Sequence, residues 1–184
     1  GHAEPVRHLC LSSGLESLPA AAITAASVAL RPTPGPVIDD FAHGWRDWYR
    51  LNAGNPVHWQ HWTRKITDPA WRGPDGARLV LTLTVPQANR IAVVLVENEW
   101  RSYRGRRRTF TCTRELAGGA EPESLSFTPA DFVAVDESSG VLSSWSQIDL
   151  LGICGHHPDE RPARPAEWHG PPADIVRLEW RSAE

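Results

Sequence analysis

A short segment of the sequence combines aromatic and hydrogen-bonding side chains, the mixture with which proteins recognise sugars. It reads Asn98-Glu-Trp-Arg-Ser-Tyr-Arg-Gly105 and directly follows the most apolar run of the chain. Trp100 and Tyr103 offer flat apolar rings. The Asn98 amide both donates and accepts hydrogen bonds, and the Arg101 guanidinium is a forked donor. We expect a sugar-binding platform here. In the alternative, Trp100 packs over the edge of the fold and the arginines are solvated.

The same combination recurs at Trp71-Arg72-Gly73, and we expect this loop to assist the platform. The chain holds nine Trp against four Phe, two Tyr and no Met. Trp is rarely buried completely, and its indole N–H needs a hydrogen-bond partner. We therefore expect about five or six of the tryptophans to be structural and about two to four to be available to a ligand.

Two further tryptophans lie in the segment His58-Trp-Gln-His-Trp-Thr-Arg64. Its β-character predicts a strand, in which successive side chains point to opposite faces. One of Trp59 and Trp62 then enters the core while the other points outward, and we include Trp62 among the candidate sugar-binding residues. His58 and His61 face opposite sides of such a strand and do not chelate one metal ion together.

Catalytic and zinc-binding arrangements have weaker support in the sequence. No Gly-x-Ser-x-Gly motif occurs, and His156, His157 and His169 flank a polar loop without zinc-site spacing. The adjacent Asp39 and Asp40 point to opposite faces of a strand, so they form no catalytic dyad. A two-carboxylate glycosidase stays open, because the separation of carboxylates in space is not written in a sequence. We expect no enzymatic activity.

The elements that position these residues are short strands. Residues 1–36 are Ala-rich and end in Pro32-Thr-Pro-Gly-Pro36, which predicts an N-terminal extension and a stiff linker before a single domain at 37–184. From Val37 onward, short β-branched and aromatic runs alternate with Gly, Pro, Asn and Asp. Strands are predicted near 37–41, 47–52, 58–66, 77–85, 90–97, 108–116, 123–128, 144–153 and 174–181.

Hydrophobic alternation predicts which faces are buried. The continuously apolar run Ile91–Val96 is typical of a central strand covered on both faces. Many short strands and no long helical period predict an all-β, antiparallel β-sandwich jelly roll. Val176, Leu178 and Trp180 are expected to share one face of the last strand. The residues expected to be buried are Leu79, Leu81, Leu83, Val94, Phe127, Leu178 and most of Trp180.

Several motifs in this order resemble a known group of domains. The stretch Val37-Ile-Asp-Asp-Phe-Ala-His-Gly-Trp45 resembles the opening strand of galactose-binding-like jelly rolls, which include many carbohydrate-binding modules. Segments 67–79, 97–105, 144–152 and 178–181 are similar to sandwich modules appended to bacterial carbohydrate esterases and glycoside hydrolases. The chain departs from this pattern at Ala42, where an acidic residue is usual.

The resemblance also implies a structural calcium ion. In many such domains it lies near the opening strand and is held by carboxylates and backbone carbonyls. The corresponding residues here are Asp39 and Asp40, and Glu179 of the last strand joins them if first and last strands pair. In the alternative, one aspartate caps a turn or meets an arginine.

Charge and hydrophobicity limit the classes of partner that the chain can have. The net charge is −3, and the basic stretch Arg101–Arg108 is short, so we expect no nucleic-acid partner. No apolar run approaches the roughly 20 residues of a membrane-spanning helix, so we expect no membrane partner. Cys10, Cys112 and Cys154 are expected to be free thiols, with a Cys112–Cys154 disulfide as the alternative.

The resemblance implies a function as a non-catalytic polysaccharide-binding module. Such a module holds a tethered catalytic domain of a larger, secreted or periplasmic protein on its substrate. A structural or protein-docking sandwich without a sugar site is the first alternative, and a small glycan-acting hydrolase is the second.

Overall fold

The computed structural model describes residues 37–52, 57–98, 105–136, 140–155 and 168–182. These residues belong to the unit Thr33–Glu184. The predicted extension at 1–36 lies outside them. So do His156, His157 and the candidate residues Trp100, Arg101 and Tyr103. In the described part of the chain, no helix is long and apolar enough to cross a membrane.

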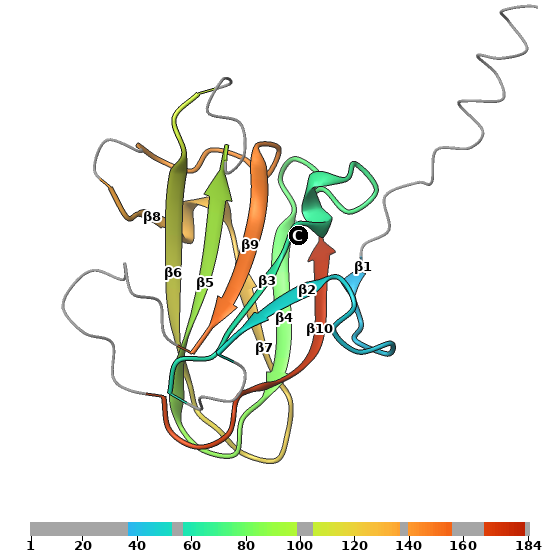
Figure 1. The fold of residues 1–184 in the computed structure, drawn as a ribbon, viewed down its shortest axis with the longest axis vertical. Coiled ribbons are helices and arrows are strands. Elements are labelled where there is room, and N and C mark those ends of the chain that lie inside the picture. Colours follow the sequence, from blue (N-terminus) through green and yellow to red (C-terminus); the bar gives the residue numbers. More distant parts are fainter. Residues whose placement is uncertain (1–36, 53–56, 99–104, 137–139, 156–167, 183–184) are drawn as a thin grey trace, which may run out of the picture. The chain divides into compact units, whose positions relative to one another are not determined.

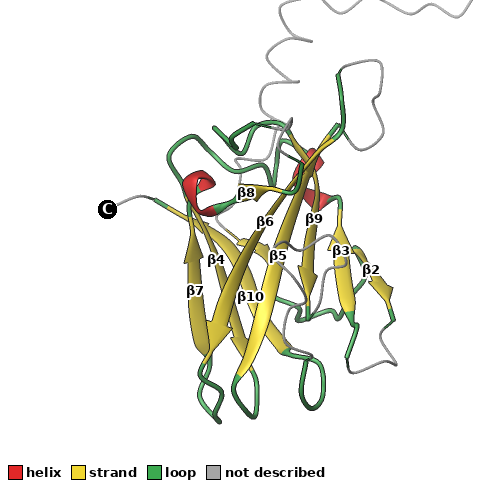
Figure 2. Ribbon diagram, turned by 90° about the vertical axis from the view of Figure 1, so that its left-hand side faces the viewer, coloured by secondary structure: helices red, strands yellow, loops and turns green. Residues whose placement is uncertain are grey.

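The described residues form two antiparallel sheets packed face to face, as the alternating sequence predicts (Figure 1, Figure 2). The first sheet has the strand order β1-β10-β4-β7, and the second has the order β2-β3-β9-β5-β6-β8. The all-β sandwich is thereby confirmed, while its jelly-roll type stays a prediction. The strands are β1 (Val37–Asp39), β2 (Trp48–Leu51), β3 (Gln60–Thr63), β4 (Arg78–Thr84), β5 (Asn89–Glu97), β6 (Arg108–Leu116), β7 (Glu123–Phe127), β8 (Val133–Ala134), β9 (Ile148–Cys154) and β10 (Asp174–Arg181).

Helical structure in the described residues is confined to two short 3-10 turns, η1 (Lys65–Thr67) and η3 (Pro129–Asp131). The predicted strand at 58–66 is shorter than expected, because the chain turns into η1 after Thr63. The two-residue strand β8 was not predicted, since so short a segment carries no alternation.

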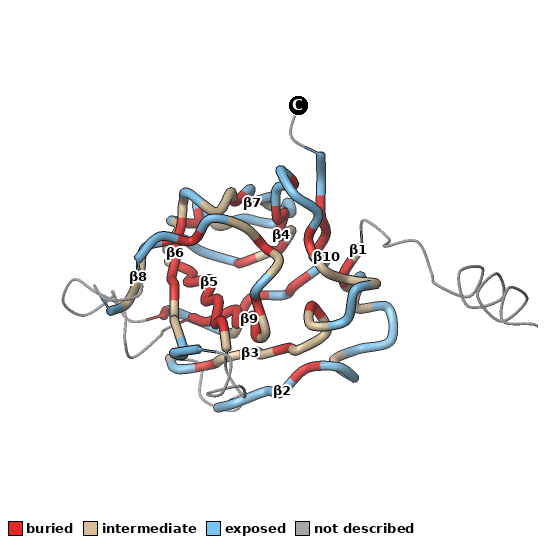
Figure 3. The backbone as a smooth tube through the Cα atoms, turned by 90° about the horizontal axis from the view of Figure 1, so that it is seen from above, coloured by how far each residue is buried: buried red, intermediate tan, exposed pale blue. Residues whose placement is uncertain are grey.

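The core lies between the sheets and is made of buried residues from strands of both. The buried positions along each strand are red in Figure 3. Strand β5 is central, pairing with β6 on one side and β9 on the other, and Ile91–Val96 are at most 2% exposed. All seven residues predicted to be buried are buried, Trp180 being the most exposed of them at 5%. Five of the described tryptophans are core residues, while Trp45, Trp62 and Trp71 remain partly exposed.

The prediction that Val176, Leu178 and Trp180 share one face of the last strand, β10, is wrong for Val176. Val176 is 41% exposed, whereas Leu178 and Trp180 are buried. The register of β10 against β4 shifts between Ile175 and Arg177, so one extra residue interrupts the alternation. Such a bulge moves the residues on its two sides out of phase, and Val176 therefore points to solvent.

Candidate functional site

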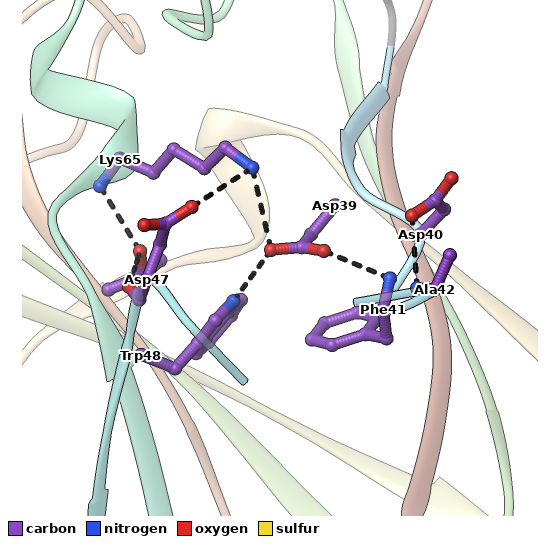
Figure 4. Close-up of polar contacts among 8 residues, drawn as sticks. Asp39, Asp40, Phe41, Ala42, Asp47, Trp48 and Lys65 are labelled. Atoms are coloured by element: carbon purple, nitrogen blue, oxygen red, sulfur yellow. Dashed lines mark hydrogen bonds and ion pairs between the residues drawn. The ribbon is translucent and has the colours of Figure 1, made fainter. Parts of the chain in front are cut away.

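Asp39 organises the turn that leaves β1 (Figure 4). One carboxylate oxygen accepts a hydrogen bond from the backbone N–H of Phe41 at 2.9 Å, and the other accepts one from the Trp48 indole N–H at 2.9 Å. Asp40 forms a similar turn by accepting the Ala42 N–H at 3.1 Å. Phe41, which donates to Asp39, adopts the left-handed backbone conformation with φ 55°, which is uncommon for a bulky residue. Two consecutive turns thus return the chain toward β2.

Lys65 connects this turn to η1. Its ammonium lies 3.5 Å from the Asp39 carboxylate and 3.6 Å from that of Asp47. Its backbone N–H also donates to the Thr63 hydroxyl, which itself donates to the Asp47 carbonyl at 2.8 Å. The Lys65 and Asp39 side chains are only 16% and 12% exposed, whereas Asp47 is 61% exposed. In this ion-pair cluster, Lys65 and Asp39 are therefore sheltered from solvent, and the Asp47 carboxylate is open to a ligand.

Two adjoining hollows border this cluster. The first measures about 480 Å³, within the range of small-ligand sites, and the second about 380 Å³. Both are lined by Arg46, Asp47, Lys65 and Trp71. The first is completed by Trp48, Tyr49, Arg64, Thr67 and Asp68, and the second by Val37, Ile38, Asp39, Asp40, His43 and Gly44. We call the two hollows together the β1–η1 groove.

Aromatic rings border the β1–η1 groove. Tyr49 is 60% exposed, and Trp71 is half-buried with the Lys65 ammonium 5.0 Å from its ring centroid. The Trp71 backbone is anchored, because its carbonyl accepts the Trp180 indole N–H at 3.0 Å. A rigid loop thus presents an aromatic ring beside charged side chains.

The other predicted sugar-binding residues have different positions. Arg72 donates from Nη2 to the Thr67 carbonyl at 2.8 Å and so stabilises the loop after η1 rather than lining a hollow. Trp62 lines neither hollow. Its ring lies against Gly152 and packs on Ala92, Val94 and Cys154, on the sheet face turned away from the core. As predicted, the other tryptophan of this segment, Trp59, enters the core from the position just before β3.

Asn98 terminates β5 in the left-handed conformation, with φ 57°, and its amide donates to the Arg106 carbonyl at 3.2 Å. Strands β3 and β5 are each antiparallel to β9, so they run in the same direction. Their carboxyl ends therefore lie at the same end of the sandwich (Figure 1). The Trp71 loop and the start of segment 98–105 share that end.

The predicted calcium ligands do not form one donor set. Strands β1 and β10 do pair, with Val37 opposite Glu179. The Glu179 carboxylate is nevertheless bound by Arg177 at 2.7 Å and by Arg181 at 2.6 Å. Burial raises its pKa, but these two arginines outweigh burial and hold the pKa below its usual value. Among the described residues, no three His, Cys, Asp or Glu side chains gather into a metal-binding group. The donors thus fit calcium poorly, and calcium stays a prediction.

A buried carboxylate lies at the end of β5. Glu97 is 3% exposed and forms an ion pair with Arg108 of β6. Burial raises the Glu97 pKa and outweighs Arg108, and the nearby Asp149 carboxylate raises it further. The Glu97–Arg108 pair anchors the strand immediately before segment 98–105.

Cys112 and Cys154 are both buried free thiols, so the alternative of a disulfide between them is wrong.

Most residues that line the groove were not predicted as site residues. Among them, Arg46, Asp47 and Lys65 flank the β2–β3 pair at the open end of that hairpin, and Tyr49 lies within β2. The sequence does hold a signal, because charged residues immediately precede one strand and follow the next. Their convergence depends on the pairing of Trp48 with Thr63, which is a matter of register.

Comparisons with known proteins found no related sequence or structure. No protein-family model matches the chain, and neither a curated protein nor a solved structure matches it.

Proposed function

We propose that this chain is a non-catalytic carbohydrate-binding module and that the β1–η1 groove is its binding site. The observation that carries the proposal is the groove itself, in which Tyr49 and Trp71 border fixed charged side chains at one end of the sandwich. Sugars offer apolar ring faces and hydroxyl rims, so they need this combination of aromatic rings and hydrogen-bonding groups.

The components divide the work of recognition. The exposed Tyr49 ring offers a stacking surface, and the Trp71 ring borders both hollows. The Asp47 carboxylate accepts hydroxyl hydrogens, while Arg46 donates to hydroxyl oxygens. Because the Asp39–Lys65 pair is sheltered, it holds the surrounding groups in place rather than contacting the sugar.

Asp39 belongs to the fold rather than to a catalytic pair. It accepts hydrogen bonds from Phe41 and Trp48 and pairs with Lys65, so its carboxylate is committed to structure. In the alternative of a two-carboxylate glycosidase, the remaining candidates in the groove are Asp40, Asp47 and Asp68. In the proposed role, the module keeps a tethered catalytic domain near its polymer by raising the local concentration, as part of a secreted or periplasmic protein.

The first prediction concerns Trp71. Trp71→Ala and Tyr49→Ala are each expected to weaken binding to a soluble polysaccharide roughly tenfold, since an aromatic contact contributes about 0.5–1.5 kcal/mol beyond area burial and about 1.4 kcal/mol is tenfold in affinity. Affinity electrophoresis and calorimetry over a broad polysaccharide panel measure this. The melting temperature of each variant verifies that it is folded.

Two controls sharpen the test. Val133 is 67% exposed on β8, at the far edge of the same sheet from β2, so Val133→Ala should bind like the parent chain. Trp100→Ala tests the platform predicted at 98–105. If Trp100→Ala abolishes binding while Trp71→Ala and Tyr49→Ala leave it intact, the site is that segment. If the parent chain binds no glycan, the structural or docking role is the better one.

A further inference from the structure

The two hollows of the β1–η1 groove differ in charge. The first is lined by the three cations Arg46, Arg64 and Lys65 and by the two acids Asp47 and Asp68. The second is lined by the three acids Asp39, Asp40 and Asp47, and by Arg46, Lys65 and His43. Arg46, Lys65 and Asp47 line both hollows, so the difference lies in Arg64 and Asp68 on one side and in Asp39, Asp40 and His43 on the other. We call the first hollow the cationic half and the second the acidic half.

Most of these charges have partners within the protein. Lys65 lies between the Asp39 and Asp47 carboxylates, and the Asp68 carboxylate accepts the Ala70 N–H at 2.8 Å. Arg46 differs, because it is exposed, lines both hollows and forms no ion pair with any described acidic residue. Its guanidinium is thus available to an anion at the point where the hollows meet.

We infer that the ligand is an acidic glycan, whose sugar carboxylate pairs with Arg46 where the two hollows of the groove meet. This inference rests on the proposed function and names the substrate class. A planar guanidinium matches a carboxylate through two parallel hydrogen bonds, a geometry that a sugar hydroxyl cannot reproduce. In the acidic half, Asp40 and Asp47 accept hydroxyl hydrogens from the neighbouring sugar.

The same charges favour a uronic acid over a heavily sulfated sugar. A polymer with several sulfates per disaccharide carries negative charge past Asp40 and the 61% exposed Asp47 carboxylate. Like charges at such short range repel. A chain in which a uronic acid alternates with a neutral sugar places its carboxylate at Arg46 and the hydroxyls of the neutral sugar at the aspartates.

The test uses matched pairs of probes. Polygalacturonate, alginate and hyaluronan are each compared with their carboxyl-reduced, neutral forms by calorimetry, at low and at physiological salt. At least one acidic form is expected to bind tenfold or more tightly than its reduced form. Salt should narrow this difference, because a surface ion pair is screened.

Variants locate the charge recognition. Arg46→Gln should abolish the difference in affinity between the acidic and the reduced form, because the Gln amide still donates to a hydroxyl but carries no charge to pair with a carboxylate. Arg46→Lys keeps the charge without the fork and should recover part of the loss. Arg78 is exposed at the start of β4 and lines neither hollow, so Arg78→Gln is the matched control and should bind like the parent chain.

The outcomes separate the two proposals. Trp71-dependent binding to neutral glycans, with no gain from a carboxylate, overturns the acidic ligand and leaves the proposed function standing. Tighter Arg46-dependent binding to heparin than to any uronate polymer overturns the carboxylate class. Acidic binding that Arg46→Gln leaves unchanged overturns the role of Arg46. Failure to bind any glycan removes the proposed function itself.

Discussion

His61 is a titratable side chain enclosed by aromatic rings. It is 1% exposed, its ring centroid lies 4.2 Å from that of Trp45 and 5.1 Å from that of Trp59, and its Nδ1 is buried without a hydrogen-bond partner. Burial and the Arg50 guanidinium together lower its pKa from 6.5 to about 4, although a backbone hydrogen bond at Gln60 opposes them. His61 is therefore neutral in the folded chain at neutral pH.

This burial predicts a loss of stability in acid. Between pH 6.5 and about 4 the unfolded chain takes up a proton at His61 that the folded chain does not, so the free energy of unfolding falls as the pH falls through this window. The full effect is about 3 kcal/mol, since one pKa unit corresponds to about 1.4 kcal/mol. Urea titrations of the parent chain at pH 7.0, 5.5 and 4.5 measure the loss.

The matched variant is His61→Phe, which keeps an aromatic ring in the cage and cannot be protonated. Its loss of stability between pH 7 and 4.5 should be smaller than that of the parent chain. His169→Phe replaces an exposed histidine and should follow the parent. Equal pH slopes for the parent and His61→Phe would contradict this account.

At the scale of elements, the loop from Trp71 to Ala77 is closed by two buried indoles. The Trp180 N–H donates to the Trp71 carbonyl, and the Trp145 N–H donates to the Ala77 carbonyl at 2.8 Å. Gly73 lies between them. A Cβ at this position would come within 2.7 Å of the Trp180 ring and 2.8 Å of the Trp145 Cβ, so only glycine fits.

Gly73→Ala is accordingly expected to destabilise the fold by about 1–3 kcal/mol, the usual cost of overpacking. Trp180→Phe removes the ring atoms that a Cβ would meet. The Gly73→Ala change should therefore cost less in the Trp180→Phe background, which a double-mutant cycle in urea measures as a coupling energy. Additive effects in that cycle would show that the indole is not the obstacle.

Most of the strands were predictable, because a strand is marked by the residues within it and by the turn residues beside it. Strand positions follow from β-branched and aromatic runs between turn residues, and β5 was recognisable as central because both of its faces are apolar. The bulge at Ile175–Arg177 was not predictable, since it depends on how β10 fits against β4. A register shift of this kind leaves no mark in the composition of either strand.

The candidate site was predictable only in part, because it is assembled from residues that are distant in the sequence. Trp71 was singled out from its neighbours in sequence, and it does line the β1–η1 groove. Arg46, Asp47 and Lys65 come together only through the β2–β3 register and the two turns after β1. Trp62 carries an equally suggestive sequence but lies against Gly152, on a different surface.

At the scale of the whole molecule, Asp39 links the edge strand β1 to β2 and η1. Strand β1 is an edge strand of three residues, so the turn that follows it is held chiefly by the bonds of Asp39 to Phe41, Trp48 and Lys65. The Lys65 ammonium lies 3.5 Å from one oxygen of this carboxylate, so a calcium ion that bound this oxygen would have to displace it. A metal ion and Lys65 therefore compete for the same oxygen.

This competition makes calcium testable through stability. A ligand that binds only the folded chain raises the free energy of unfolding by about 2.7 kcal/mol at a hundred times its dissociation constant. Because Lys65 already neutralises Asp39, we expect the melting temperature to be the same in EDTA and in millimolar CaCl2. Lys65→Met removes the competing ammonium, and it should lower the melting temperature in EDTA. A rise with CaCl2 in the parent chain would instead establish the calcium site that the resemblance implies. A rise confined to Lys65→Met would show that the carboxylates accept calcium only once the lysine is gone, which is the relation the ion-pair geometry predicts.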